Sequence, residues 1–311
     1  MRSSTLLLGS ALAGTAFAAP YRAASRLDLP HDVSGRDQAC NGFSELCGRK
    51  YSDVTFVGAH DSAFVGVLPM DNQFEDVADQ LSQGIRFLQA QSHSKNNAIE
   101  LCHTSCIIKD AGPLKNFLSP IKSFLDGNAN EVVTLLLTNG DGISVSAFDA
   151  VFQAIGLASY AYVPSGVIAF DAWPTLSELI SSGKRLVVFM DYHTDTSKVD
   201  YILDEFSFIY ETPFDTTDPK FAQCTVDRPP NGDTTKLMGL VNHFLDVEID
   251  IFGEQILIPD TLKTGKTNSL ASITAQTSLC VSQHTRTPNF VLLDFISVGD
   301  ALKAQKQLNG L

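Results

Sequence analysis

Two histidines stand close to the ends of short apolar segments, and histidine is the side chain best suited to moving protons near neutral pH. His60 directly follows Val54–Ala59, and His103 lies two residues beyond Ile99–Leu101. Two imidazoles that face each other can remove a proton from one oxygen and supply a proton to another. This arrangement suits reaction at phosphorus, in which a hydroxyl is deprotonated and an alkoxide leaves. His60 and His103 are therefore candidates for the catalytic base and acid.

Carboxylates and amides also stand where apolar segments end. Asp61 is adjacent to His60, and Asp294 lies late in the chain; either carboxylate could orient an imidazole and raise its pKa. The candidates for contact with a substrate are Gln89, Gln91, Asn242 and His243. If parallel strands carry these residues, the carboxyl ends of the strands bring them to one face of the fold.

Eight apolar runs rich in β-forming residues alternate with amphipathic helical patterns. The runs predicted as strands are Val54–Ala59, Ile85–Ala90, Ile99–Leu101, Val132–Leu137, Leu186–Met190, Phe208–Tyr210, Leu237–Phe244 and Phe290–Phe295. The predicted helices lie in Phe74–Gln83, Leu114–Leu125, Val145–Ile155, Leu176–Ile180 and Leu270–Val281. This alternation predicts parallel strands joined by right-handed crossovers. The fold expected for a chain of this length is a single-domain α/β fold, a (β/α) TIM barrel. An open doubly wound sheet is the rival, but the sequence lacks its usual glycine-rich phosphate loop.

One segment breaks this pattern by alternating acidic and apolar residues. Asp246–Ile251 alternates strictly, and a second apolar run, Gln255–Ile258, follows it closely. Alternation with period two predicts strands with one solvated face, so we expect a hairpin near the mouth of the barrel. A cation site formed by the three acids of the first run is the alternative.

The amino terminus resembles a secretory signal. Residues 1–18 contain Arg2, a short apolar stretch that begins at Leu6, and the small-x-small pattern Ala16–Ala18. A transmembrane anchor is the rival interpretation, but the apolar run is too short to span a bilayer. We therefore expect a secreted, extracellular protein without a transmembrane anchor, in which residues 19–53 form an N-terminal extension and residues 54–311 form the barrel domain.

The charge of the chain excludes some partners. The formal net charge is -13, with 22 basic and 35 acidic residues. Nucleic acid binding needs clustered positive charge, so no nucleic acid partner is expected. The same imbalance argues against tight electrostatic adhesion to anionic lipid.

Six cysteines, an even number in a chain with a secretory signal, predict three disulfides. Local spacing favours Cys40–Cys47 and Cys102–Cys106, which leaves Cys224–Cys280. A bridge between Cys102 and Cys106 would restrict the motion of His103, which lies between them. A metal site that uses Cys102, His103 and Cys106 is the alternative.

Several motifs together carry a family resemblance. They are Val54–Ser62, Gln80–Gln89, Leu101–Cys106, Asn130–Asn139, Ala158–Pro164, Val241–Leu245 and Pro288–Phe295. In order and spacing they resemble the X domain of the phosphatidylinositol-specific phospholipase C superfamily, and more narrowly the secreted fungal phospholipase-C-like phosphodiesterases. The resemblance extends from about Cys40 to about Leu308.

The resemblance implies a distorted, incomplete TIM barrel and a phosphoric diester hydrolase that acts on a small-molecule or lipid phosphodiester. In the phospholipases, a histidine after the first strand is the base that activates the inositol 2-hydroxyl, and a histidine after the third strand is the acid for the leaving alcohol. These roles fall on His60 and His103. Asp61 matches the polar residue next to the base, and Asp294 is the candidate for the aspartate that supports it.

The chain departs from the family at Gln89 and Gln91, where metal-free bacterial relatives have an arginine and calcium-dependent relatives have acidic ligands. Regular alternation would place Arg86 on the opposite face of the strand, so Arg86 is not expected to replace the missing charge. Glutamine amides can donate hydrogen bonds to an oxyanion or coordinate a cation through oxygen. No cofactor is therefore required, although a calcium or magnesium ion is compatible with these side chains.

Other function classes remain open. A catalytically weakened barrel that binds phosphorylated or glycan ligands is the alternative that neutral Gln89 and Gln91 favour. A secreted glycosidase would need two carboxylates about 5–10 Å apart. Asp61 and Asp294 could be such a pair, but their spacing does not single them out. The serine-hydrolase elbow and the His-Glu-x-x-His zinc signature are both absent from the sequence.

Overall fold

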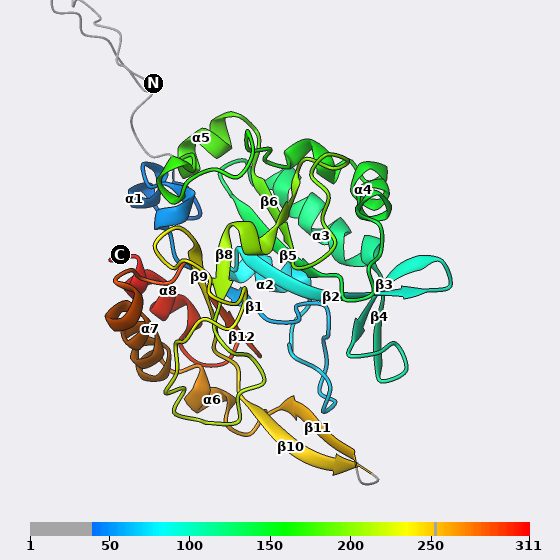
Figure 1. The fold of residues 1–311 in the computed structure, drawn as a ribbon, viewed down its shortest axis with the longest axis vertical. Coiled ribbons are helices and arrows are strands. Elements are labelled where there is room, and N and C mark those ends of the chain that lie inside the picture. The colour runs from blue at the N-terminus through cyan, green and yellow to red at the C-terminus, as the bar shows by residue number, and fades with distance from the viewer. Residues whose placement is uncertain (1–38, 252–253) are drawn as a thin grey trace, which may run out of the picture. The chain divides into compact units, whose positions relative to one another are not determined.

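A curled sheet of parallel strands forms the centre of the fold (Figure 1). The structure is a computed structural model that describes residues 39–251 and 254–311, so the predicted signal segment, residues 1–18, lies outside the described residues. The eight strands of the main path, in chain order, are β1 (Phe56–Ala59), β2 (Phe87–Lys95), β5 (Val133–Thr138), β6 (Leu186–Met190), β7 (Ile202–Asp204), β8 (Ile209–Glu211), β9 (Met238–Asn242) and β12 (Phe290–Leu293). They pair in the order β7-β6-β5-β2-β1-β12-β9-β8, and every pairing along this path is parallel.

The path is an incomplete barrel whose two edges are β7 and β8. These strands follow each other in the chain and are joined by a single 3-10 turn, Glu205–Ser207. This seam replaces the hydrogen-bonded closure of a complete barrel. The predicted distorted, incomplete TIM barrel is therefore confirmed.

The prediction that Ile99–Leu101 forms another parallel barrel strand is wrong. It lies in β3 (Ala98–His103), which pairs antiparallel with the outer half of β2 and with β4 (Lys109–Pro113). The turn between β2 and β3 contains Asn96 and Asn97, both with positive φ, as a tight hairpin turn requires. His103 therefore reaches the mouth of the barrel at the end of a hairpin, and not at the end of a parallel strand.

The predicted hairpin after residue 245 is confirmed. Strands β10 (Asp246–Ile251) and β11 (Glu254–Pro259) pair antiparallel as a separate two-stranded sheet, and the hairpin projects away from the barrel (Figure 1). It follows β9 closely, at the carboxyl end of the parallel strands. The hairpin therefore stands beside the mouth.

Strand alternation sorts the side chains of the parallel sheet into two sets. Phe56, Phe87 and Phe290 point into the barrel and pack with Tyr51 and Trp173 at its amino end. The intervening residues of the same strands join the helices in a second apolar cluster. Toward the carboxyl ends of the strands, the inward-facing side chains are polar. Aromatic rings therefore fill the amino end of the barrel, and polar side chains line its carboxyl end.

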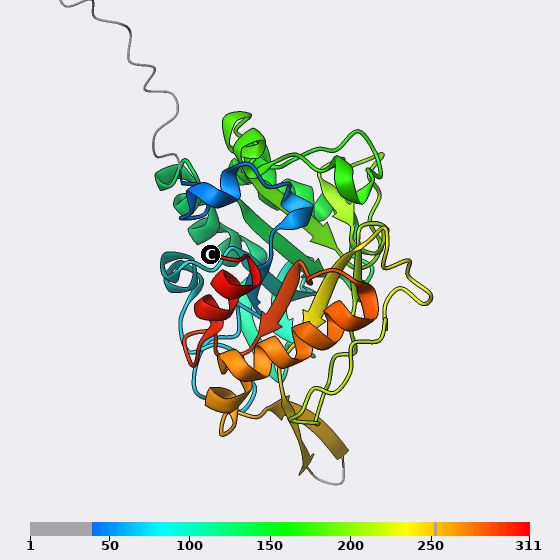
Figure 2. The same ribbon diagram turned by 90° about the vertical axis from the view of Figure 1, so that its left-hand side faces the viewer.

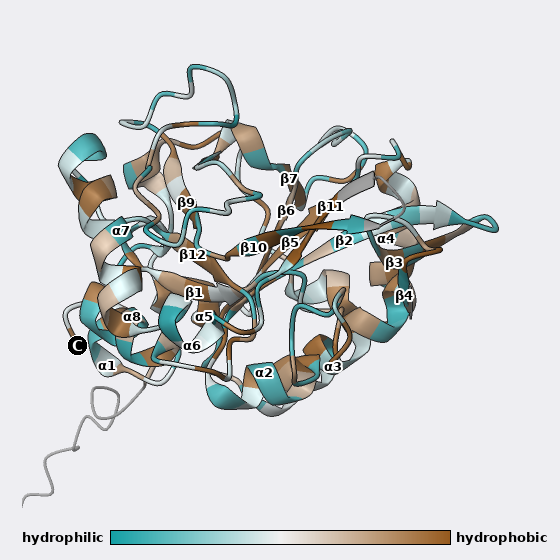
Figure 3. Ribbon diagram, turned by 90° about the horizontal axis from the view of Figure 1, so that it is seen from below, coloured by the Kyte–Doolittle hydropathy of each residue, from teal (hydrophilic) through white to brown (hydrophobic). Residues whose placement is uncertain are grey.

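Five of the described helices cover the outer face of the sheet: α2 (Val77–Gln83), α3 (Leu114–Gly127), α4 (Val145–Ala154), α7 (Leu270–His284) and α8 (Ala301–Leu308). Two others, α1 (Ser44–Cys47) and α5 (Leu176–Ser181), pack with the apolar cluster inside the barrel, and the short α6 (Thr264–Thr267) precedes α7. Figure 2 shows α7 and α8 crossing the strands near the carboxyl terminus. In Figure 3 the strands are mostly brown, whereas the helices carry both brown and teal residues, as expected for helices with one buried face. Within the described residues, no helix has the length and apolar character needed to span a bilayer.

All three predicted disulfides are present: Cys40–Cys47, Cys102–Cys106 and Cys224–Cys280. The pairing of Cys102 with Cys106 rules out the alternative metal site that would use both thiolates. Cys40 and its neighbour Leu46 belong to the same apolar cluster as the barrel interior, so the segment before β1 contributes to the closed end of the barrel.

We expect Gly58→Ala in β1 to lower the free energy of unfolding by about 1–3 kcal/mol, because an added Cβ would lie 2.3 Å from the Phe87 ring inside the barrel. Gly48→Ala is the matched control, since a Cβ at Gly48 would meet nothing within 4 Å. Urea or thermal unfolding of both variants checks the prediction. Equal stability of the two variants would contradict the tight packing described here.

Candidate active site

A pocket of about 560 Å³ opens at the carboxyl ends of the strands. Both candidate catalytic histidines, His60 and His103, line it, together with Gln89, Gln91 and Asn242. The hairpin contributes Ile256, Leu257 and Pro259 to the same wall. The structure therefore brings together residues that are more than 180 positions apart in the sequence.

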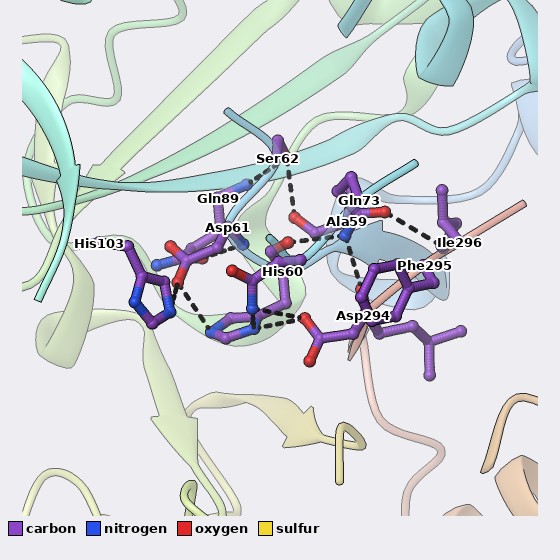
Figure 4. A network of polar contacts seen from close by, with 12 residues as sticks. Ala59, His60, Asp61, Ser62, Gln73, Gln89, His103, Asp294, Phe295 and Ile296 are labelled. Atoms are coloured by element: carbon purple, nitrogen blue, oxygen red, sulfur yellow. Dashed lines mark hydrogen bonds and ion pairs between the residues drawn. The ribbon is translucent and has the colours of Figure 1, made fainter. Parts of the chain in front are cut away.

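His60 follows β1 and is held by Asp294, Asn72 and Phe244, and Figure 4 shows its imidazole beside the Asp294 carboxylate. Its Nδ1 lies 2.9 Å from Asp294 Oδ1, and the amide of Asn72 donates to the same carboxylate oxygen over 3.0 Å. The Phe244 ring stacks on the imidazole, with 3.7 Å between ring centroids and 3° between planes. Because Asp294 accepts from Nδ1–H, the lone pair of the neutral imidazole is left on Nε2, where it can accept a proton.

Asp61 lies between the two imidazoles. Its Oδ2 is 3.6 Å from Nε2 of His60 and 3.6 Å from Nε2 of His103, so the two nitrogens are no more than about 7 Å apart. The side chains of His60 and His103 keep 14% and 10% of their surface exposed, whereas that of Asp61 keeps none. Both imidazoles are thus open to the pocket while the carboxylate that relates them is buried. Phe64 contacts the His103 ring edge-on at 5.3 Å.

Gln89 and Gln91 hold Asp61 in place. The amide oxygen of Gln89 accepts the backbone N–H of Asp61, and the amide nitrogen of Gln91 donates to Asp61 Oδ2 over 2.8 Å. The amide oxygen of Gln91 accepts the backbone N–H of Thr104, next to His103. Gln91 therefore links the segment that carries one histidine to the segment that carries the other, and both glutamines act on the geometry of Asp61.

The electrostatics of the pocket favour a protonated His60. Burial lowers the pKa of the imidazole, but three nearby carboxylates outweigh burial and raise the pKa to about 9. These carboxylates belong to Asp61, Asp294 and Asp246. Burial also raises the pKa of Asp61 above its ordinary value, and the two imidazoles oppose that shift.

The wall opposite the histidines is acidic around one arginine. Arg228 donates to Glu211 at 2.5 Å, and its guanidinium lies 4.5 Å from the centre of the Phe214 ring. Glu205, at the seam of the barrel, is fully buried, and burial and the charge of Glu211 raise its pKa well above the usual range. Burial also raises the pKa of Asp191 to about 6. Arg228 is thus engaged by a carboxylate and an aromatic ring.

Two sequence expectations about neighbouring residues have different outcomes. Asn242 lines the pocket and donates to Glu211 and to the Thr212 carbonyl oxygen. His243 is fully buried, and its two ring nitrogens contact Gln276 and the carbonyl oxygen of Thr267. The geometry does not support substrate contact by His243. Strand alternation explains the difference, because residues 242 and 243 point to opposite faces of the sheet.

Arg86 does not reach the pocket, as alternation predicts. Its guanidinium donates to Glu131 and to the carbonyl oxygens of Leu81 and Ile85, and it packs against Phe124. The charge that relatives place near the end of the second strand is therefore not restored by Arg86.

The side chains of the pocket do not fit a divalent-cation site. Within residues 39–251 and 254–311, no three or more His, Cys, Asp or Glu side chains are grouped so that they could hold a metal ion. The amide oxygens of Gln89 and Gln91 both accept backbone N–H groups. Among the acids of the β10–β11 hairpin that the structure describes, none belongs to such a group either.

Sequence reasoning missed three residues that shape the pocket, Asn72, Arg228 and Phe244, and it considered Asp246 only as one acid of the alternative cation site. Phe244 was detectable, because it lies in the predicted strand Leu237–Phe244, two positions after Asn242, although β9 itself ends at Asn242. Asn72 and Arg228 lie on irregular segments, where no periodicity predicts the direction of a side chain. Only the folded chain brings them to the histidines.

We expect Asp294→Asn to lower the pKa of His60 from about 9 by about 1 pH unit or more, because the imidazolium loses a neighbouring charge and a strong acceptor. NMR titration of the histidine ring protons checks the prediction. Asp126→Asn, an exposed carboxylate on α3, is the control and should leave His60 unchanged. An unaltered His60 titration in Asp294→Asn would contradict this account.

Asp246→Asn should stabilise the protein at pH 8 but not at pH 4. Burial raises the folded-state pKa of Asp246 to about 7, whereas an unfolded aspartate titrates near about 3.9. A raised carboxyl pKa favours the folded state at low pH, and that contribution is lost as pH rises from about 4 through about 7.

At pH 8 the neutral amide should therefore raise the free energy of unfolding by on the order of 1–3 kcal/mol. Denaturant unfolding at both pH values tests this difference. Exposed Asp200→Asn is the control. The same change at both pH values in Asp246→Asn would exclude the electrostatic explanation.

Comparison with known proteins agrees with the geometry. The sequence profile of a family described as PI-PLC X 1 matches residues 46–309. A protein of Arthroderma benhamiae, named PI-PLC X domain-containing protein 1, is 50% identical over 283 residues, which cover 89% of this chain and 92% of that protein. A second protein of that fungus, named an uncharacterized secreted protein, is 44% identical over 270 residues, and the match covers 84% of this chain and 61% of the relative.

Solved structures show the same fold at low sequence identity. The phosphatidylinositol-specific phospholipase C from Listeria monocytogenes superposes with a TM-score of 0.55 at 15% identity, covering 88% of this chain and 98% of that chain. A mutant of the Staphylococcus aureus enzyme gives a TM-score of 0.54 at 16% identity, covering 80% and 88%. The family profile matches most of this chain, residues 46–309, and a relative is 50% identical to it over 283 residues. This chain therefore belongs to the PI-PLC X family.

Proposed function

We propose that this protein is a secreted phosphodiesterase in which His60 and His103 act as base and acid at phosphorus. The observation that carries the proposal is the position of the two Nε2 atoms, each 3.6 Å from one oxygen of Asp61 and no more than about 7 Å apart at the wall of the pocket. A base and an acid must each come within about 3 Å of a reacting oxygen. A phosphoryl group with its entering and leaving oxygens in line fits between nitrogens at this separation.

In the first step, Nε2 of His60 takes the proton of a hydroxyl that neighbours the phosphodiester on the same substrate. This step uses the neutral imidazole, which a pKa of about 9 makes the minor form at neutral pH and the main form only above about pH 9. The hydroxyl oxygen forms a bond to phosphorus, and the bond from phosphorus to the leaving alcohol breaks. Protonated His103 supplies a proton to that alcohol. Asp294 steadies the imidazolium that forms on His60 through the hydrogen bond to Nδ1. The product is a cyclic phosphodiester.

In the second step the roles reverse, and water opens the cyclic ester. His103 takes a proton from water, the water oxygen bonds to phosphorus, and His60 returns its proton to the departing ring oxygen. Both histidines regain their starting states. Asp61, which contacts both imidazoles, compensates whichever ring carries the positive charge.

The phosphoryl charge is stabilised differently from that in relatives with an arginine or calcium near the second strand. Gln89 and Gln91 are neutral and hold Asp61, and Arg228 is paired with Glu211. Positioned cationic stabilisation contributes several kcal/mol to such barriers, so we infer slower turnover than that of a site with a free cation near phosphorus. Protonated His103, and the imidazolium that forms on His60 as it takes the proton, supply the positive charge near phosphorus.

The family assignment supports a substrate class, and the amino terminus and the disulfides support secretion. The pocket would hold a small-molecule or lipid phosphodiester, as the family assignment indicates. Secretion is supported by the signal-like amino terminus, by three disulfides and by the relative named as a secreted protein.

A protein that binds phosphorylated or glycan ligands without turnover is the second candidate function. It is favoured by the acidic wall around Arg228 and by the neutral amides at Gln89 and Gln91, which offer an anionic transition state little positive charge. Phosphate or glycan binding with no turnover of any phosphodiester would support this candidate over the enzyme.

We expect His60→Ala and His103→Ala each to reduce the turnover of phosphatidylinositol and of an aryl phosphodiester by about 10²- to 10⁴-fold. The control His193→Asn changes an exposed histidine whose positive φ asparagine tolerates. Thermal unfolding confirms that each variant is folded. Turnover that is equal in the wild type and both alanine variants would reject the catalytic roles.

A further inference from the structure

The pocket contains more acidic groups than the proposed chemistry at phosphorus uses. Five acidic residues line it together with one arginine, Arg228. The five are Asp191, Glu205, Glu211, Asp215 and Asp246. A phosphodiester is itself an anion, so this lining repels it unless another part of the ligand carries positive charge. The acidic groups therefore bear on which substituent the phosphate carries.

Glu205 stands out among these acids because it is buried without a donor. Its side chain is fully buried and borders the pocket at the seam between β7 and β8. Within the residues that the structure describes, no donor reaches either of its carboxyl oxygens. Burying a polar group without a hydrogen bond costs free energy, and native proteins rarely leave such a group unmatched. Glu205 thus lacks a partner that a bound ligand can supply.

The surroundings of Glu205 are short of positive charge. Burial and the charge of Glu211 raise the pKa of Glu205 well above its usual range. Glu211 itself receives Arg228 and Asn242, and both donate to its Oε2. The same guanidinium also acts on the charge of Asp191. One guanidinium therefore faces three carboxyl groups at this end of the pocket.

Two further acids extend the acidic lining to the histidines. Asp215, an exposed residue that lines the pocket, interacts electrostatically with His60 and His103 as well as with Arg228. Asp246 interacts in the same way with His60 and Asp215. A ligand whose phosphate lies at the histidines therefore meets negative charge all the way to Glu205.

A ligand group that binds at Glu205 has to donate hydrogen bonds and to supply positive charge. A hydroxyl group donates a hydrogen bond but leaves the excess of negative charge unbalanced. A quaternary ammonium group brings the charge but has no N–H to donate. A primary ammonium group donates three N–H bonds and carries a full positive charge, and charge-assisted hydrogen bonds to carboxylates are the stronger kind. The primary ammonium group alone among these three meets both requirements.

We propose that the pocket selects phosphodiesters that carry a primary ammonium group, which binds Glu205 and Glu211 while the phosphate lies between His60 and His103. This inference rests on the proposed function for the position of the phosphate, and it extends that function by naming the class of head group. The ammonium charge balances the charge of the phosphodiester, so the ligand enters the acidic pocket without net charge.

The test is calorimetric titration of the full chain with two matched series of probes. One series consists of methyl ω-aminoalkyl phosphodiesters with four to six carbons in the alkyl chain, and the other consists of the ω-hydroxyalkyl phosphodiesters of the same lengths. The terminal hydroxyl is too far from phosphorus to form a five- or six-membered cyclic ester, so binding is measured without turnover. At the best chain length we expect the amine to bind about tenfold or more tightly than the alcohol.

Glu205→Gln should reduce the preference for the amine to about threefold or less, because the amide keeps the shape of the side chain but carries no charge. Asp215→Asn changes an exposed residue whose positive φ asparagine tolerates, and it should reduce the preference by about two- to fivefold. Glu45→Gln, at an exposed glutamate of α1, is the matched control and should leave the preference unchanged. Thermal unfolding confirms that each variant is folded.

Equal affinity of the wild type for amine and alcohol would overturn the proposal, and so would an amine preference that Glu205→Gln and Asp215→Asn both retain. Tighter binding of the alcohols would identify a pocket for polyols and reject the ammonium site.

The two proposals for this pocket can fail separately. Turnover that depends on His60 and His103, without any preference for amines, would reject the ammonium site and leave the catalytic roles standing. An amine preference that depends on Glu205, combined with turnover that does not depend on the histidines, would reject the catalytic roles and leave the ammonium site standing.

Discussion

A buried carboxylate between two imidazoles is the interaction on which the site depends. Asp61 has no exposed surface, so its charge is tolerated only because His60, His103 and the amide of Gln91 surround it. The same carboxylate fixes the distance between the two rings, since one oxygen contacts both. Gln89 and Gln91, which stand where relatives have charged groups, serve this arrangement by holding the backbone and side chain of Asp61.

More carboxylates lie near His60 and His103 than the two imidazolium charges would balance. Asp246 and Asp294 add to the negative charge near His60, and the consequences are a pKa of about 9 for the imidazole and about 7 for Asp246. On the opposite wall, Arg228 is neutralised by Glu211. The pocket is therefore strongly basic at His60 but supplies little free positive charge to an anionic substrate. The carboxylates that make His60 a strong base therefore also weaken the stabilisation of negative charge on the phosphoryl group.

The scaffold separates packing from chemistry along each strand. Inward-facing positions near the amino ends are aromatic and close the barrel, whereas inward-facing positions near the carboxyl ends are polar and form the pocket. The seam between β7 and β8 leaves space for Glu205, whose buried carboxyl group faces Glu211. The departures from a regular barrel, which are the seam, the β3–β4 extension and the β10–β11 hairpin, all border the pocket. Function is thus concentrated where regular pairing stops.

Local patterns in the sequence predicted the parts of the fold that depend on short-range rules. Strand periodicity located most of the parallel sheet and the β10–β11 hairpin, cysteine spacing identified the three disulfides, and motif order placed His60 and His103 in one pocket. The Asn96–Asn97 turn was also a local signal, and overlooking it made β3 appear to be a parallel barrel strand.

Tertiary structure alone decided how the polar side chains are shared among partners. Whether Gln91 faces a substrate or Asp61, whether Arg228 is free or paired, and whether His243 reaches the pocket all depend on contacts between segments far apart in the chain. A hydrogen bond depends on distances of a few tenths of an ångström and on direction, and residue type and spacing carry neither. The sequence by itself thus determined which chemical groups meet at the mouth of the barrel, and the folded chain determined which of them remain available to react.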